Sequence, residues 1–148
     1  MKKVVVSACL LGCDCRYKGD NCKNAELLSL LSDCAILPVC PEQMGGLSTP
    51  RPPAERQGDR VVAATGTDVT GPYRRGAQTA LYLAQLTGAD FAVLKAKSPS
   101  CGKGLIYDGS FTGNKIPGNG VTVELFAAAG IPVYTEEETE AIRLALTE

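Results

Sequence analysis

The chain has 148 residues, with 15 Lys plus Arg, 16 Asp plus Glu, seven Cys and no His. Hydrophobic residues make up 45% of it and charged residues 21%, which is typical of a folded globular protein and excludes a disordered one. A net charge of −1 argues against a broad phosphate-binding face, so we expect no stable binding to nucleic acid. The absence of His excludes Ser-His and Cys-His catalysis and every His-containing zinc site.

The predicted elements alternate along the chain between short β-branched strands and helical patterns. The predicted strands are Lys3–Ala8, Ala35–Val39, Arg60–Ala64, Asp90–Ala96 and Ile131–Tyr134. The predicted helices are Ala25–Ser32, a helix that Asp68 or Thr70 caps and Gly88 ends, Val121–Ala129, and Glu136–Leu146 after a cap at Thr135. Strands separated by such helices predict an α/β fold, as a single three-layer Rossmann-like domain over residues 1–148 with a mainly parallel sheet.

Two connecting segments carry strong turn signals. The prolines between positions 38 and 53 predict a stiff, irregular loop over Pro38–Ala54. The dipeptide Asp108-Gly109 predicts a small hairpin within Leu105–Phe111.

The number of cysteines is odd, so they cannot all pair within one chain. The basic start before Val4–Val6 is only superficially like a secretion signal, since the valines are better explained as a buried strand. No stretch approaches the roughly 18 apolar residues of a membrane span. We therefore expect a cytoplasmic protein with reduced thiols and no membrane association, in which cysteines bind metal or react more often than they form disulfides.

Three cysteines follow predicted strands. Cys9 follows the first strand, Cys40 follows the second, and Cys101 lies in the loop after the fourth. The carboxyl ends of parallel strands meet at one edge of the sheet, where such folds bind ligands, so these thiols are expected to converge. Three thiols without His fit an iron–sulfur cluster that keeps one iron open. The alternative is that Cys9 and Cys40 are small core residues.

The remaining cysteines offer a competing site. Cys13, Cys15 and Cys22 could bind zinc or iron, or form a redox disulfide, although their spacing matches no standard motif. That possibility predicts a non-catalytic metal-binding or redox-sensing module in place of an enzyme. Cys34 ends an apolar helical pattern and is expected in the core.

Glu42 lies two residues after Cys40 on the Pro- and Gly-rich loop, where it is well placed as a general acid or base. The alternative is a solvated loop carboxylate. Arg51 and Glu55, farther along the same loop, can form a structural ion pair.

Ser98 and Ser100 lie just before Cys101, where their hydroxyls can donate protons or hydrogen bonds to a ligand. The alternative is that they only satisfy backbone groups of the turn. Lys97 and Lys103 flank this segment and are expected to lower the pKa of the nearby thiol.

Seven motifs, in order along nearly the whole chain, together resemble the thiouracil desulfidase family, formerly domain of unknown function 523. They are Ser7-Ala-Cys-Leu-Leu-Gly12, Cys15-Arg-Tyr-Lys-Gly19, Cys40-Pro-Glu42, Gly45-Gly-Leu-Ser-Thr-Pro-Arg51, Gly66-Thr-Asp-Val-Thr70, Ser98-Pro-Ser-Cys-Gly102 and Tyr107-Asp-Gly109. Two positions depart from the family pattern: Cys13, where it has no cysteine, and Lys18, where it usually has Asp.

The resemblance implies an oxygen-sensitive [4Fe–4S] cluster held by Cys9, Cys40 and Cys101, with one iron open. It also implies that Glu42 is the acid or base and that a serine, Ser98 or Ser100, assists. The implied reaction is a non-redox, hydrolytic desulfuration of a small thiolated base such as 2-thiouracil. Its thiocarbonyl sulfur would bind the open iron, water would attack the carbon, and uracil and sulfide would be released. An iron–sulfur enzyme acting on another thio-compound is an alternative, and we expect a monomer or a small homo-oligomer.

Overall fold

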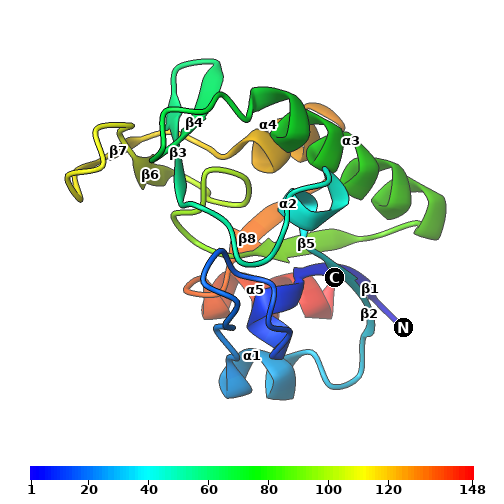
Figure 1. The fold of residues 1–148 in the computed structure, drawn as a ribbon. Coiled ribbons are helices and arrows are strands. Elements are labelled where there is room, and N and C mark those ends of the chain that lie inside the picture. Colours follow the sequence, from blue (N-terminus) through cyan, green and yellow to red (C-terminus); the bar gives the residue numbers. More distant parts are fainter.

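A four-stranded parallel sheet forms the centre of the structure, a computed structural model that describes residues 1–148 (Figure 1). The order of its strands is β2-β1-β5-β8. Their bounds are Lys3–Ser7 for β1, Ala35–Val39 for β2, Phe91–Leu94 for β5 and Val133–Thr135 for β8. Four of the five predicted strands therefore lie in this sheet, within three residues of their expected ends.

Helices cover both faces of the sheet (Figure 1). Side chains alternate along a strand, so Val4 and Val6 of β1 pack on one face and Val5 on the other. The first face is covered by α1 (Ala25–Leu30) and α5 (Thr139–Thr147), and the second by α3 (Thr70–Thr87) and α4 (Val121–Ala128). The expected three-layer α/β fold is confirmed. No helix has both the length and the apolar character needed to cross a membrane.

The strand order places a crevice at the carboxyl end of β1. From β1 the chain passes through α1 to β2 on one side, and it later returns to β5 on the other side. Such a reversal leaves a crevice outside the strand ends. The segments that border it are the 3₁₀ turn η1 (Ala8–Leu11) after β1 and the loop that follows β5.

Two antiparallel hairpins lie apart from the main sheet. The predicted strand Arg60–Ala64 exists as β4 (Arg60–Ala63), but it pairs with β3 (Ala54–Gln57), which the sequence analysis did not predict. An antiparallel pair can expose one face to solvent, which suits the polar residues of β3. Its strands can also be joined by a short turn, without a crossover helix. The second pair is the hairpin predicted within Leu105–Phe111. It is longer than expected, because β6 (Leu105–Tyr107) pairs with β7 (Lys115–Pro117).

The segment Pro38–Ala54 is not wholly irregular, as was expected. Residues Pro41–Met44 form the short helix α2, which begins with a proline whose fixed φ suits the first helical position. Helices α2 and α3 touch through glycines. A Cβ atom at Gly76 would lie 1.6 Å from the carbonyl oxygen of Pro41, and one at Gly45 would lie 1.9 Å from that of Pro72. This close backbone contact fixes the position of α2.

Substitution of Gly76 tests this contact. Gly76→Ala is expected to lower the free energy of unfolding by roughly 1–3 kcal/mol, because the added methyl group forces the two helices apart. Gly71→Ala, in the same helix, meets only the flexible side chain of Arg75 and should be neutral or slightly stabilising. Urea unfolding of both variants is the measurement. Equal stability of the two would contradict the close contact.

Helix α5 begins three residues later than predicted. Thr135 is the last residue of β8, and its hydroxyl accepts a hydrogen bond from the N–H of Glu137 at 3.2 Å. Two of the glutamates expected in the first turn of the helix form ion pairs with lysines instead. Glu136 pairs with Lys95 at 3.0 Å and Glu138 with Lys103 at 3.0 Å, and these ion pairs tie the β8–α5 connection to the loop after β5.

Candidate active site

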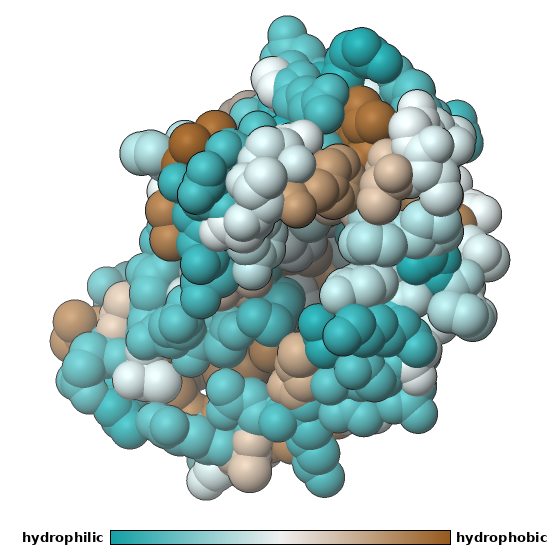
Figure 2. Space-filling view, turned by 60° about the vertical axis from the view of Figure 1, so that its left-hand side comes forward, coloured by the Kyte–Doolittle hydropathy of each residue, from teal (hydrophilic) through white to brown (hydrophobic).

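A cavity of about 480 Å³ lies at the carboxyl ends of β1, β2 and β5. Figure 2 shows a recess between the upper and lower parts of the molecule on this side. Its volume lies within the range that accommodates small-molecule ligands. The structure brings together all six residues singled out in the sequence, which are Cys9, Cys40, Glu42, Ser98, Ser100 and Cys101.

The three predicted thiols reach the cavity from three separate segments. Cys9 lies in the turn η1 and is buried, and Cys40 is the half-buried residue that precedes α2. Cys101 lies in the loop after β5, where its side chain is 5% exposed and its N–H donates a hydrogen bond to Ser98 Oγ at 3.0 Å. The convergence expected from strand order is therefore present.

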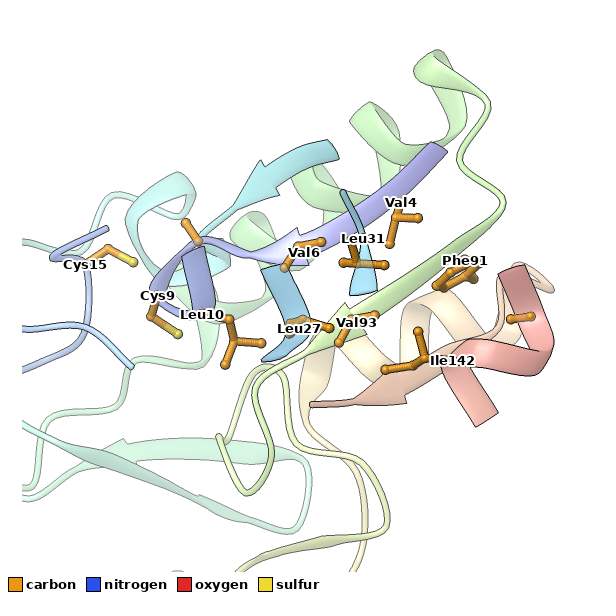
Figure 3. Packing of buried hydrophobic residues seen from close by; sticks show 12 residues of the cluster. Val4, Val6, Cys9, Leu10, Cys15, Leu27, Leu31, Phe91, Val93 and Ile142 are labelled. Carbon is orange, nitrogen blue, oxygen red and sulfur yellow. The ribbon is translucent and has the colours of Figure 1, made fainter. Parts of the chain in front are cut away.

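A fourth thiol, that of Cys15, lines the same cavity and is only 5% exposed. Its carbonyl oxygen accepts hydrogen bonds from Cys40 Sγ at 3.7 Å and from Arg51 Nη2 at 2.9 Å. Figure 3 shows Cys9 and Cys15 together at one end of a buried hydrophobic cluster, with Phe91 toward its opposite end. Cys15 is thus part of the site, although its sequence position predicted a competing group with Cys13 and Cys22.

The competing group does not assemble. Cys13 is exposed, and Cys22 is half-buried beside the core without lining the cavity. Cys34, as expected, packs against the core. No three His, Cys, Asp or Glu side chains are placed to hold a single metal ion.

The pKa is raised for three thiols of the cavity, those of Cys15, Cys40 and Cys101. Burial raises the pKa of Cys101 to about 12, although hydrogen bonds with Ser7 and Ser100 act in the opposite direction. The hydrogen bond with Cys40 lowers the pKa of Cys15, but the hydrogen bond with Cys9 and burial together outweigh it and raise that pKa to about 11. The expected lowering by lysine is wrong for Cys101, because burial dominates and Lys103 is paired with Glu138.

This set of donors fits a polynuclear iron–sulfur cluster. All seven cysteines are free, and four of them line one cavity. Thiolates, formed when a metal replaces the thiol proton, are the usual ligands of iron–sulfur clusters. The ligands of such a cluster bind different iron atoms and therefore lie farther apart than those of a single ion. Four thiols that line one cavity, with no group of three placed around a single metal ion, agree with that arrangement.

The carboxylate of Glu42 is fixed on both of its oxygens. Arg51 donates to Oε2 through Nε at 3.1 Å and also through Nη2, and the Tyr73 hydroxyl donates to Oε1 at 2.6 Å. The exposed fraction is 16% for the side chain of Glu42 and 5% for that of Arg51. Burial and the neighbouring Glu42 charge raise the pKa of Tyr73, so its hydroxyl stays a donor. Glu42 is therefore no solvated loop carboxylate.

The ion pair between Arg51 and Glu55 that their positions allowed does not form, because Arg51 pairs with Glu42. Glu55 Oε1 instead accepts hydrogen bonds from the N–H groups of Gly109 at 3.0 Å and Phe111 at 3.2 Å. This contact joins the first hairpin to the turn of the second. Glu55 lines the cavity as a structural residue, and Arg51 is left to hold Glu42.

The two serines differ in what their hydroxyls do. Ser98 Oγ accepts hydrogen bonds from the N–H groups of Ser100 at 3.1 Å and Cys101 at 3.0 Å, which leaves its own proton free to be donated. Ser98 is half-buried. Ser100 is 1% exposed, and its hydroxyl is bonded to that of Thr122 at 2.8 Å.

The model of the 2-thiouracil desulfurase family matches residues 4–138, which include every segment of this cavity. The chain belongs to the 2-thiouracil desulfurase family. One relative is the protein YbbK of Bacillus subtilis (strain 168), which is 41% identical over 94% of this chain and 99% of its own length. A solved structure, that of the [4Fe–4S]-dependent thiouracil desulfidase TudS, is similar with a TM-score of 0.94 and 46% identity, over 99% of each chain. The family resemblance read from the motifs is confirmed.

Three residues of this desulfurase-family cavity were missed as site residues. Tyr73 lies in a predicted helix but was not singled out, Arg51 was expected as a partner of Glu55, and Cys15 was expected in a competing group with Cys13 and Cys22. A signal existed for two of them, since Arg51 and Cys15 lie inside the motifs that carry the resemblance. Tyr73 reaches Glu42 because α3 and α2 touch at their glycines, a contact that no local pattern reveals.

Proposed function

We propose that this chain is an iron–sulfur enzyme that removes sulfur from a small thiolated base such as 2-thiouracil, in a hydrolytic and non-redox reaction. One observation carries the proposal. A cavity with converging thiols and a fixed carboxylate lies in a chain that is 46% identical, over 99% of its length, to a [4Fe–4S]-dependent thiouracil desulfidase. A cluster on reduced thiols also agrees with the cytoplasmic location expected from the sequence.

In this proposal, Cys9, Cys40 and Cys101 hold a [4Fe–4S] cluster and leave one iron without a thiolate from these three residues. Two observations support these ligands. The three cysteines follow three strands and line one cavity, and the pKa values of Cys40 and Cys101 are raised, so that a metal can replace their thiol protons. When bound, the cluster supplies a Lewis-acidic iron for a thiocarbonyl sulfur.

Glu42 is the proposed base that takes a proton from the attacking water. Arg51 and Tyr73 hold both carboxylate oxygens in place, so the group needs no reorganisation before it accepts the proton. Cys40 precedes it by two residues, and α2 therefore presents the ligand and the base on the same wall of the cavity.

Ser98 is the proposed hydroxyl that donates a proton or a hydrogen bond to the ring. Its hydroxyl acts only as an acceptor within the protein, so its proton can be donated to a ligand, and the residue is half-buried at the cavity. Ser100 is better suited to hold the loop, because its hydroxyl is buried against Thr122. These contacts favour Ser98 over Ser100.

Tyr73→Phe tests the fixation of Glu42. Loss of one charge-assisted hydrogen bond is expected to reduce kcat roughly 10- to 150-fold, since such bonds contribute about 1.5–3 kcal/mol, with little change in KM. The kinetic constants of sulfide release are the measurement. Tyr82→Phe, at an exposed position of the same helix, is the matched control and should not change kcat. An unchanged kcat in Tyr73→Phe would show that Arg51 alone fixes Glu42.

The proposed function is tested by anaerobic reconstitution with iron and sulfide, followed by removal of excess sulfide and incubation with 2-thiouracil. Uracil and sulfide are expected in equal amounts. Release no greater than that of the Cys101→Ala variant would overturn the assignment of 2-thiouracil as substrate. A cluster that assembles but leaves 2-thiouracil intact would direct the search to another thio-compound.

A further inference from the structure

Cys15 is a buried thiol of the cavity for which the proposed reaction has no use. It is 5% exposed and lies against Cys9 in the same buried cluster, with Cys40 packed beside them. The three come from different places: the turn after β1, the loop beyond it, and the residue before α2. A site built for three ligands thus contains a fourth group of the same chemistry.

The position of Cys15 is fixed from its backbone. Its carbonyl oxygen accepts two hydrogen bonds, from Cys40 Sγ at 3.7 Å and from the buried Arg51 at 2.9 Å. Its N–H donates to the carbonyl oxygen of Cys13 at 2.8 Å. The same arginine holds Glu42, so Cys15 is tied to the wall that carries both a proposed ligand and the proposed base.

We propose that, in the absence of substrate, Cys15 ligates the iron of the cluster that Cys9, Cys40 and Cys101 leave open. This inference rests on the proposed function. Four thiolates are the usual ligand set of a [4Fe–4S] cluster, and any group held by Cys9 and Cys40 lies next to Cys15. Cys15 would close the cluster against loss of iron while no substrate is bound.

Substrate binding then requires an exchange of ligands. The bond between iron and Cys15 Sγ breaks and a bond between iron and the thiocarbonyl sulfur forms. No electron is transferred, and the released thiolate takes a proton from water in the open cavity. Cys15 is thus a protective ligand that the reaction displaces, and it is not required for cleavage of the carbon–sulfur bond.

Loss of the open iron gives a direct readout. A [4Fe–4S] cluster with an iron that lacks a protein ligand loses that iron on mild oxidation and gives a paramagnetic [3Fe–4S] cluster. The experiment treats anaerobically reconstituted protein, without substrate, with limiting ferricyanide and follows the [3Fe–4S] signal by electron paramagnetic resonance. Wild type and Cys15→Ala are compared, and Cys13→Ala, at an exposed thiol two residues away, is the control.

Cys15→Ala is expected to form the [3Fe–4S] cluster at least several-fold faster than wild type and Cys13→Ala, while it retains sulfide release from 2-thiouracil. Added 2-thiouracil should abolish the difference, because substrate replaces Cys15 on the iron. Equal rates in wild type and Cys15→Ala would overturn the inference and leave the proposed function intact. Failure of the wild type to assemble any cluster would overturn both.

Discussion

Glu42→Gln is expected to lower the rate of sulfide release from 2-thiouracil by roughly two to four orders of magnitude, the usual contribution of a general base. Glutamine keeps the size of the side chain. Its amide oxygen can accept from Arg51, and its amide nitrogen can donate to the oxygen of Tyr73, so the contacts around α2 are retained. What is lost is the ability to take a proton. The cluster should therefore assemble normally, with the iron content and absorption spectrum of the wild type.

The matched control for this variant is Glu55→Gln. Glu55 is the other glutamate of the cavity, and its oxygen accepts from two backbone N–H groups, a role that an amide oxygen can keep. Its activity is expected to stay within a few-fold of wild type. A Glu42→Gln variant that is as active as Glu55→Gln would exclude Glu42 as the base and would turn attention to Ser98.

The extent to which the sequence predicted this site depended on the range of the contacts involved. The positions of Cys9, Cys40 and Cys101 at strand ends follow from the alternation of strands and helices, which is a local pattern with a fixed topological consequence. Their meeting in one cavity could therefore be predicted. The α/β fold was predictable for the same reason.

The contacts that were missed depend on long-range packing. Tyr73 reaches Glu42 across 31 positions of sequence, and Arg51 reaches the carbonyl oxygen of Cys15 across 36. Neither pair has a local periodicity. The late start of α5 has a similar cause, since Glu136 and Glu138 bond to lysines of the β5 loop and do not enter a first helical turn. Tertiary ion pairs here outweigh the helix signal of three consecutive glutamates.

Cys101→Ala is expected to lose both the stable cluster and sulfide release. Cys101 reaches the cavity from the loop after β5. Cys15 lies beside Cys9 and Cys40, so it is not placed to replace Cys101 as a ligand. The fold should survive, because the substitution removes one sulfur atom and keeps the hydrogen bond from the N–H of residue 101 to Ser98 Oγ.

Three measurements on Cys101→Ala separate a lost ligand from a damaged fold. Unreconstituted variant and wild type should unfold at similar temperatures, but only the wild type should gain stability on reconstitution, since binding to the folded state alone is stabilising. Bound iron and acid-labile sulfide should fall far below the wild-type and Cys13→Ala levels. A variant that keeps a full cluster would contradict Cys101 as a ligand.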